Sequence, residues 1–231
     1  AGGEELRDTL CRESVTYTVR RNNIEVAASH RFCNAAPVTI AIYYGMQSMF
    51  EGETHVLTPG GAYTDWTEAA KASTFTKQEY PLFRRYVEKN RQGYQSTWLL
   101  PDGLGDHALL DGQDDIFIYA PYGKSYHKLF GNKRMENGDK TCWRGVYTWF
   151  ETPVADDADL LCYEGSAGGH TAVFIDCKRA CKRTLALPGY LDLRHFGTAE
   201  QNSGIRISAA GRNKLKIKAD APGSCVLLLR E

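Results

Sequence analysis

The sequence predicts a mainly β protein, built as an antiparallel β-sandwich or barrel-like domain or domains, with one or two short helices between residues 64 and 92. Segments in which apolar and polar residues alternate indicate the strands, and Gly, Pro, Asn and Asp between them indicate the turns. The clearest segment is 38–44, where the even-numbered positions share one predicted inner face: Val38, Ile40, Ile42 and Tyr44.

The predicted strands are spread over the whole chain. In order they cover residues 15–19, 24–27, 38–44, 116–120, 146–150, 160–163, 171–176, 205–208, 215–218 and 225–229. Most of them are short and closely spaced, which is typical of sandwiches and barrels.

Between Thr64 and Gln92 the apolar spacing changes from two residues to about 3.6 residues, the period of a helix. Pro81 suits the first position of a helix, and the apolar residues after it form one stripe: Leu82, Phe83, Tyr86 and Val87. We therefore expect a short surface helix here.

The stretch 153–159 begins with Pro153 and contains three Asp residues, so it resembles a linker and predicts a division of the chain near residue 155. Residues 1–155 are expected to form one β domain. Residues 156–231 are expected to form either a second small β domain or an extension of the same sandwich.

Composition and charge limit the possible functions. The 231 residues are 42% hydrophobic and carry 28 basic and 28 acidic side chains, which is typical of a globular protein without net charge. Zero net charge removes the usual attraction to nucleic acid or to an anionic membrane, and it suits a protein that associates with copies of itself. No apolar run reaches the roughly 18–20 residues of a transmembrane helix, so we expect no transmembrane segment. No motif indicates a cofactor.

The seven cysteines are distributed along the chain: Cys11, Cys33, Cys142, Cys162, Cys177, Cys181 and Cys225. The lack of Cys-x-x-Cys pairs argues against a structural zinc site and favours disulfides in a secreted, extracellular or periplasmic protein. Cys177 and Cys181 can close a small loop, or each can pair with a distant partner. A bridge from Cys162 or Cys11 to Cys225 is a further alternative. The odd number leaves at least one thiol unpaired or joined to another chain.

Several short motifs occur in an order that resembles a known family. They are Phe32-Cys33-Asn34, the strand 38–44, the Pro59-Gly60 turn after Glu51-Gly52-Glu53, Phe117-Ile118-Tyr119-Ala120, and Cys142-Trp143-Arg144-Gly145 running into Trp149-Phe150-Glu151. Over roughly residues 24–155 the chain thus resembles the family of secreted bacterial proteins called domain of unknown function 1036. The resemblance implies a secreted, disulfide-bearing β domain, with Cys33 and Cys142 as the expected pair. It implies no catalytic residues.

One glycine-rich segment invites comparison with a catalytic loop. Segment 165–170 contains Ser166 and His170, but Glu164 stands where a nucleophile elbow requires glycine. We therefore expect a hairpin here, and we assign no catalytic residue.

Acidic residues gather in a turn-rich segment. Asp102, Asp106 and Asp111 are weak candidates for calcium ligands, although carboxylates in such loops are more commonly solvated turn residues. A hydrolase built on Asp102, Asp106 or His107 is the least favoured function, since one sequence does not show how far apart its carboxylates lie.

A basic segment over 177–183 contains Lys178, Arg179, Lys182 and Arg183. Such local basicity can bind phosphate or acidic sugars, although a solvated turn is the more common role.

Three aromatic residues share one face if 143–150 is a strand: Trp143, Tyr147 and Trp149. When they are exposed, such side chains stack on sugars or anchor protein interfaces, and the alternative is that they fill the core.

The first predicted strand suggests how the protein associates. Val15, Tyr17 and Val19 alternate with polar residues, and an exposed strand of this kind can pair with a neighbouring molecule. We therefore expect a secreted, non-enzymatic structural or interaction protein that assembles with copies of itself through β-edge contacts, as an oligomer or an extracellular filament. The alternative is a monomeric extracellular module that binds carbohydrate or another ligand, such as a cell-surface glycan or protein.

Overall fold

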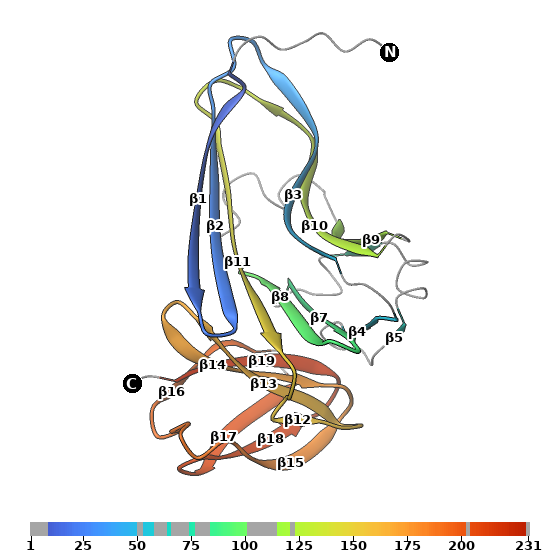
Figure 1. The fold of residues 1–231 in the computed structure, drawn as a ribbon, viewed down its shortest axis with the longest axis vertical. Coiled ribbons are helices and arrows are strands. Elements are labelled where there is room, and N and C mark those ends of the chain that lie inside the picture. Colours follow the sequence, from blue (N-terminus) through green and yellow to red (C-terminus); the bar gives the residue numbers. More distant parts are fainter. Residues whose placement is uncertain are drawn as a thin grey trace.

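The computed structural model describes residues 9–49, 53–57, 64–65, 74–76, 84–100, 115–120, 123–201 and 204–229. Within these ranges the regular elements are all strands, arranged in four antiparallel sheets, so the predicted mainly β fold is confirmed (Figure 1). This described part contains no helix of the length and apolar character needed to cross a membrane.

The largest sheet, called the arm sheet below, has the strand order β1-β2-β11-β8-β7-β4-β5. Its strands are β1 (Cys11–Arg20), β2 (Asn23–Phe32), β11 (Lys140–Phe150), β8 (Gly93–Leu99), β7 (Arg84–Asn90), β4 (His55–Leu57) and β5 (Thr64–Asp65). Figure 1 shows β1, β2 and β11 side by side as a long arm that extends away from the C-terminal strands.

A four-stranded sheet, called the cover sheet, has the order β3-β10-β9-β6. Its strands are β3 (Val38–Met49), β10 (Lys124–Met135), β9 (Asp115–Ala120) and β6 (Thr74–Thr76). The cover sheet lies over one face of the arm sheet, where the ring of Tyr43 on β3 packs edge-on against His30 on β2 with 5.4 Å between ring centroids.

The C-terminal strands form two further sheets. The central sheet has the order β12-β13-β14-β19-β16 and the outer sheet the order β15-β18-β17. The central strands are β12 (Ala155–Asp156), β13 (Leu160–Ala167), β14 (His170–Cys177), β19 (Gly223–Leu229) and β16 (Phe196–Gln201). The outer strands are β15 (Cys181–Ala186), β18 (Lys214–Ala219) and β17 (Ile205–Gly211).

The central sheet is buried on both faces. On β14, Val173 packs toward the outer sheet with Ile217, whereas its neighbour Phe174 packs toward the arm sheet with Trp98 and Val146. Since successive side chains of a strand point to opposite faces, a strand covered on both sides must be apolar almost throughout, as β14 and β19 are. The sheets change near residue 155, but the apolar cluster around Phe174 extends across that position.

The predicted helix is wrong for residues 84–90, which form β7, while residues 81–83 lie outside the described ranges. β7 pairs with β8 on one side and with β4 on the other, so that its backbone groups are satisfied by neighbouring strands. Gly93, with φ of 126°, follows the tight turn between β7 and β8. A short apolar pattern is compatible with a helix or with a strand, and here pairing with β4 and β8 makes the segment a strand.

The predicted inner face of β3 holds only at its start. Val38 and Ile40 are half-buried, but the alternation then reverses, so that Ile42 and Tyr44 are exposed and Tyr43 points inward. The Tyr43 ring stacks on Phe130 with 4.7 Å between centroids. The register of β3 with β10 also shifts beside this position, and such irregularities change which side chains face the core.

Gly145 on β11 allows the cover sheet to approach the arm sheet closely. A Cβ atom at this position would overlap the sulfur of Met46, a fully buried side chain on β3. The absence of a side chain at Gly145 is therefore a packing requirement rather than a source of flexibility.

A buried carboxyl group also joins the two sheets. Glu88 on β7 is fully buried, and it accepts hydrogen bonds from Ser48 Oγ at 2.8 Å and from Ser125 Oγ at 3.1 Å. The two hydroxyl oxygens are themselves 2.8 Å apart. Each carboxyl oxygen of Glu88 thus has one hydroxyl partner from the cover sheet. Burial raises the pKa of Glu88 to about 7, and the hydrogen bonds from Ser48 and Ser125 oppose this only in part.

We predict that Gly145→Ala destabilises the fold by about 1–3 kcal/mol, because the added methyl group forces Met46 out of a filled site. Gly189→Ala is the matched control, since a Cβ at Gly189 meets no atom within 4 Å. Urea unfolding of both variants measures the difference, and equal stability of the two would contradict the packing requirement.

We predict that the free energy of unfolding falls by about 3 kcal/mol between about pH 4.5 and about pH 7 through Glu88 alone. In this range the unfolded chain releases the Glu88 proton while the folded protein retains it, so raising the pH favours unfolding. Glu88→Gln keeps a donor and an acceptor for the two hydroxyls but does not titrate.

Urea unfolding across this pH range should therefore show a smaller fall in stability for Glu88→Gln than for the unchanged protein. Every other ionisable group is common to both proteins, so the difference isolates Glu88. Identical pH profiles would show that Glu88 is ionised in the folded state.

Candidate functional site

The first candidate site is the outer edge of β1. β1 is the end strand of the arm sheet and pairs along its whole length with β2, from Cys11 opposite Phe32 to Arg20 opposite Asn23. No other strand of the described part pairs with its second edge. Every second residue of this ten-residue strand therefore presents backbone N–H and C=O groups that a further strand can use.

The side chains of β1 are unusually exposed for apolar residues. Tyr17 is 66% exposed and Val19 is 69% exposed, although Tyr17 lies directly opposite Val26, which is buried. The cover sheet packs over β2 and β11, where Tyr43 contacts His30 and Met46 lies against Gly145, and it leaves Tyr17 and Val19 uncovered. Side chains on this face of the arm sheet are consequently buried on β2 but exposed to solvent on β1.

These exposed residues continue across the arm sheet as an apolar strip. Val19 lies opposite Ile24, and Ile24 lies opposite Tyr147 on β11. The Tyr147 ring stacks on Trp149 with 5.8 Å between centroids. Cross-strand partners share a face, so Tyr17, Val19, Ile24, Tyr147 and Trp149 form one surface, which we call the apolar strip.

Tyr147 is held in place by the backbone of the cover sheet. Its hydroxyl accepts a hydrogen bond from the Gln47 N–H at 3.0 Å and donates one to the Gln47 carbonyl at 2.9 Å. Burial raises the pKa of Tyr147 to about 12, so the hydroxyl keeps the proton that it donates. The strip therefore rests on a rigid aromatic side chain.

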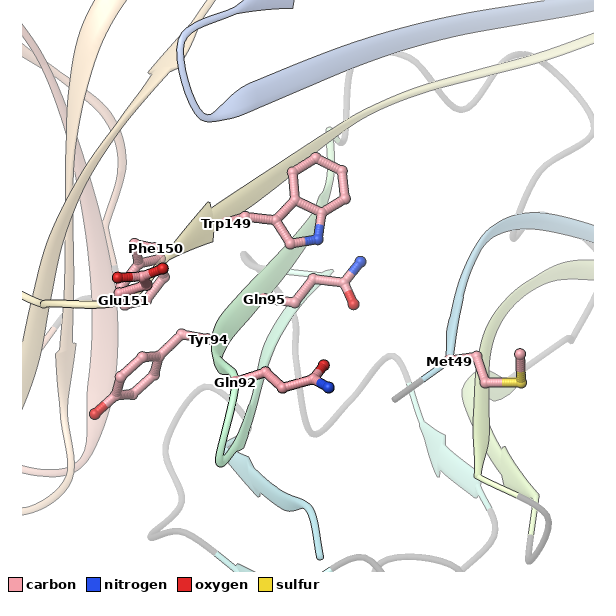
Figure 2. A pocket seen from close by; sticks show the side chains of 7 residues that line it. All are labelled: Met49, Gln92, Tyr94, Gln95, Trp149, Phe150 and Glu151. Atoms are coloured by element: carbon pink, nitrogen blue, oxygen red, sulfur yellow. The ribbon is translucent and has the colours of Figure 1, made fainter. Parts of the chain in front are cut away.

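The second candidate site is a pocket of about 740 Å³ at the end of the apolar strip. It is lined by Met49, Gln92, Tyr94, Gln95, Trp149, Phe150 and Glu151. Figure 2 shows the Trp149 indole and the carboxamides of Gln92 and Gln95 on one side of the β8–β11 pair, facing Met49 across the opening. The indole is 40% exposed.

This arrangement follows from the pairing of β8 and β11. Trp149 lies opposite Gln95, and Phe150 lies opposite Tyr94. Phe150 and Tyr94 stack on each other at 4.7 Å on the face toward the central sheet, so Trp149 and Gln95 lie on the opposite face, toward the cover sheet, where Gln95 is buried and Trp149 is partly exposed. An aromatic face beside amide and carboxylate groups can stack on a sugar ring and bond its hydroxyls.

The structure separates the third predicted aromatic residue from this pocket. Trp143 lies opposite Ala28, farther along the arm, and it does not line the pocket. The carboxamides of Gln92 and Gln95 gave no signal in the sequence, because only the strand register shows that they lie beside Trp149.

The acidic loop over 156–159 is neutralised by the basic segment over 177–183. The Asp156 carboxylate accepts hydrogen bonds from Lys178 Nζ at 2.6 Å, from Tyr94 OH at 2.6 Å and from Lys89 Nζ at 2.9 Å. Burial alone would raise the pKa of Asp156, but these three donors outweigh it and lower the pKa.

Arg183 completes this network with bonds to Asp159 at 2.7 Å and Asp157 at 2.8 Å. Arg179 also pairs with Asp159. The basic segment therefore uses most of its charge within the molecule, which is a role that the sequence interpretation did not consider. In the described part of the chain no group of three or more potential metal ligands is present.

The predicted disulfides are not formed, since no two of the seven cysteines, all of which are described, lie at bonding distance. Cys142 lies opposite Ser29 of β2, four residues before Cys33, which directly follows the end of β2. Four residues of strand span about 13 Å, which exceeds the roughly 7 Å limit between bridged Cα atoms. The expected Cys33–Cys142 pair is therefore wrong.

The other predicted pairs are absent for related reasons. Cys162 and Cys225 flank Ile175 on either side of β14, so they are two strand spacings, or about 10 Å, apart. Cys11 lies on β1 in the arm sheet, and Cys225 lies in the central sheet. The thiols of Cys177 and Cys181 are neighbours but form no disulfide. Burial is the main cause that raises the pKa of Cys177, and the nearby Cys181 thiol raises it further.

The remaining sequence candidates have separate outcomes. The segment with Ser166 and His170 is the β13–β14 hairpin, which confirms the prediction of a turn. Asp102, Asp106, His107 and Asp111 lie outside the described residues.

Comparison with models of known families, with curated proteins and with solved structures gives no match. The resemblance to domain of unknown function 1036 therefore stays a prediction from the order of short motifs. Arguments about function rest on the geometry of the β1 edge, the apolar strip and the pocket.

Proposed function

We propose that this chain is a secreted, non-enzymatic structural or interaction protein that assembles with copies of itself by strand pairing along β1. The observation that carries the proposal is the coincidence of two features on one strand. A ten-residue edge has unpaired backbone groups, and the same strand exposes Tyr17 and Val19 beside the apolar strip. Isolated exposed apolar residues are common, but a contiguous row beside an open edge favours an interface.

Symmetry supports pairing of β1 with β1 of a second copy. An antiparallel pair centred on Tyr17 would place Val15 opposite Val19 of the other copy, and the two Tyr17 side chains opposite each other. Zero net charge reduces the repulsion between copies.

We predict that replacing Tyr17 and Val19 together with Lys abolishes assembly, because the register would bring two ammonium groups at position 17 opposite each other and would charge the apolar strip. The matched control replaces Ser29 and Asn137 with Lys, two exposed residues outside β1, which adds the same charge away from the pairing edge. Light scattering coupled to size-exclusion chromatography, together with electron microscopy, measures the assembly.

The control is expected to assemble as the unchanged protein does. Substitutions are preferable to deletion of β1, since deletion would expose the edge of β2 as a new pairing site. A monomeric unchanged protein at all concentrations, or equal loss in both double variants, would refute the proposal.

A second function is favoured by the pocket beside Trp149. An indole face with two carboxamides and a carboxylate around about 740 Å³ suits a neutral sugar. This site would make the protein an extracellular carbohydrate-binding module, either as a monomer or within an assembly.

We predict that Trp149→Ala weakens the binding of a neutral oligosaccharide by about tenfold, because the stacking face is lost. Trp143→Ala is the matched control, since it removes the same side chain from the same face outside the pocket. A glycan array identifies the oligosaccharide, and calorimetry measures both variants. Binding to no neutral glycan, or equal affinities of the two variants, would exclude this function.

A further inference from the structure

The outer sheet presents a strongly basic face to solvent. Its strands alternate so that Leu215 and Ile217 of β18 are buried, whereas the residues between and beside them are exposed. The exposed residues on this face of the three strands are Lys182, Thr184, Ala186, Arg206, Ser208, Lys214, Lys216 and Lys218. We call this surface the basic face.

Strand register places its charges directly beside one another. Lys182 on β15 lies opposite Lys218 on β18, and Lys218 lies opposite Arg206 on β17. Lys216 on β18 lies between two hydroxyl residues, Thr184 on β15 and Ser208 on β17. Like charges directly opposite each other destabilise a sheet, so the arrangement opposes the stability of the fold.

Acidic side chains neutralise this face only at one edge. Asp220 accepts a hydrogen bond from Arg206 at 2.6 Å and lies 3.7 Å from the ammonium group of Lys218. None of the three outer strands contains Asp or Glu. In the described part of the molecule, no carboxylate lies within ion-pair distance of Lys182, Lys214 or Lys216.

The basic face is concave as well as charged. A depression of about 720 Å³ lies over it and is lined by residues of all three strands, including Lys182, Lys216 and Ser208. Lys214, Lys216 and Lys218 follow one another along β18 at intervals of about 7 Å, since alternate residues of a strand share a face. A line of charges at regular intervals suits a polymer with repeated negative charges.

We propose that the basic face binds an acidic polysaccharide, a chain of sugars bearing carboxylate or sulfate groups. Lysine and arginine supply the charge, and the hydroxyls of Thr184 and Ser208 supply partners for sugar hydroxyls. The face carries no aromatic side chain, which argues against single-stranded nucleic acid, whose bases stack on aromatic platforms. It also carries no large exposed apolar side chain of the kind that enters a lipid surface.

This site does not depend on the proposed assembly, because the central sheet lies between the outer sheet and the arm sheet (Figure 1). It is also distinct from the Trp149 pocket, which suits a neutral sugar. The net charge of the whole chain gives no sign of this site, because acidic residues elsewhere in the sequence offset its positive charge.

The test measures the affinity of the full chain for heparin and for polygalacturonate at about 50 mM NaCl, where surface charges are weakly screened. Neutral dextran, a single-stranded oligonucleotide and phosphatidylserine vesicles serve as comparison probes. The variant replaces Lys182, Lys216 and Lys218 with Gln. The matched control replaces Arg91, Arg134 and Lys140 with Gln, three exposed basic residues outside the outer sheet.

The unchanged protein is expected to bind at least one acidic polysaccharide and not dextran. The basic-face variant should lose at least about tenfold in affinity and the control less than about threefold. Thermal melting verifies folding, and the basic-face variant should melt no lower than the unchanged protein. Failure to bind either acidic polysaccharide, equal losses in variant and control, or tighter binding of the oligonucleotide or vesicles would overturn the proposal.

Discussion

The arrangement of the sheets depends on a stack of aromatic rings between the arm sheet and the central sheet. Tyr94 stacks on Phe150 at 4.7 Å, Phe150 on Tyr163 at 4.2 Å and Tyr163 on Phe174 at 4.9 Å. Trp98 meets Phe174 edge-on at 5.5 Å. These rings come from β8, β11, β13 and β14, so one buried stack sets how the N-terminal strands sit on the C-terminal ones.

The candidate surfaces follow from this core by alternation. Phe150 enters the stack, so its neighbour Trp149 must face the other way, into the pocket. In the outer sheet, Ile217 enters the core and Lys216 and Lys218 must face solvent. Neighbouring side chains of a strand point to opposite faces, so the residue that packs in the core fixes which face its neighbour occupies. The positions of the candidate surfaces therefore follow from the packing of the core.

Sequence alone predicted many of the strands but missed others, such as β8, β10 and β15, and it was insufficient for features that depend on strand partners. Alternation and turn residues predicted β1, β11 and β18, because these signals are local. The apolar pattern near Val87 fitted a helix as well as a strand, and only pairing with β4 and β8 decided it. Glu88 gave no sign of burial, since glutamate is ordinarily exposed and its serine partners are far away in the chain. The disulfide predictions failed because cysteine counts carry no distances.

The proposed assembly and the proposed polyanion site would reinforce each other. Pairing through β1 leaves the outer sheet uncovered, so that every copy contributes one basic face. A single face of a few lysines binds weakly at physiological salt, because its charges are screened. Two or more faces held in one assembly bind a long polymer at high effective concentration, and the combined affinity then greatly exceeds that of one copy. The edge of β1 would in this way determine how strongly the opposite end of the molecule holds its ligand.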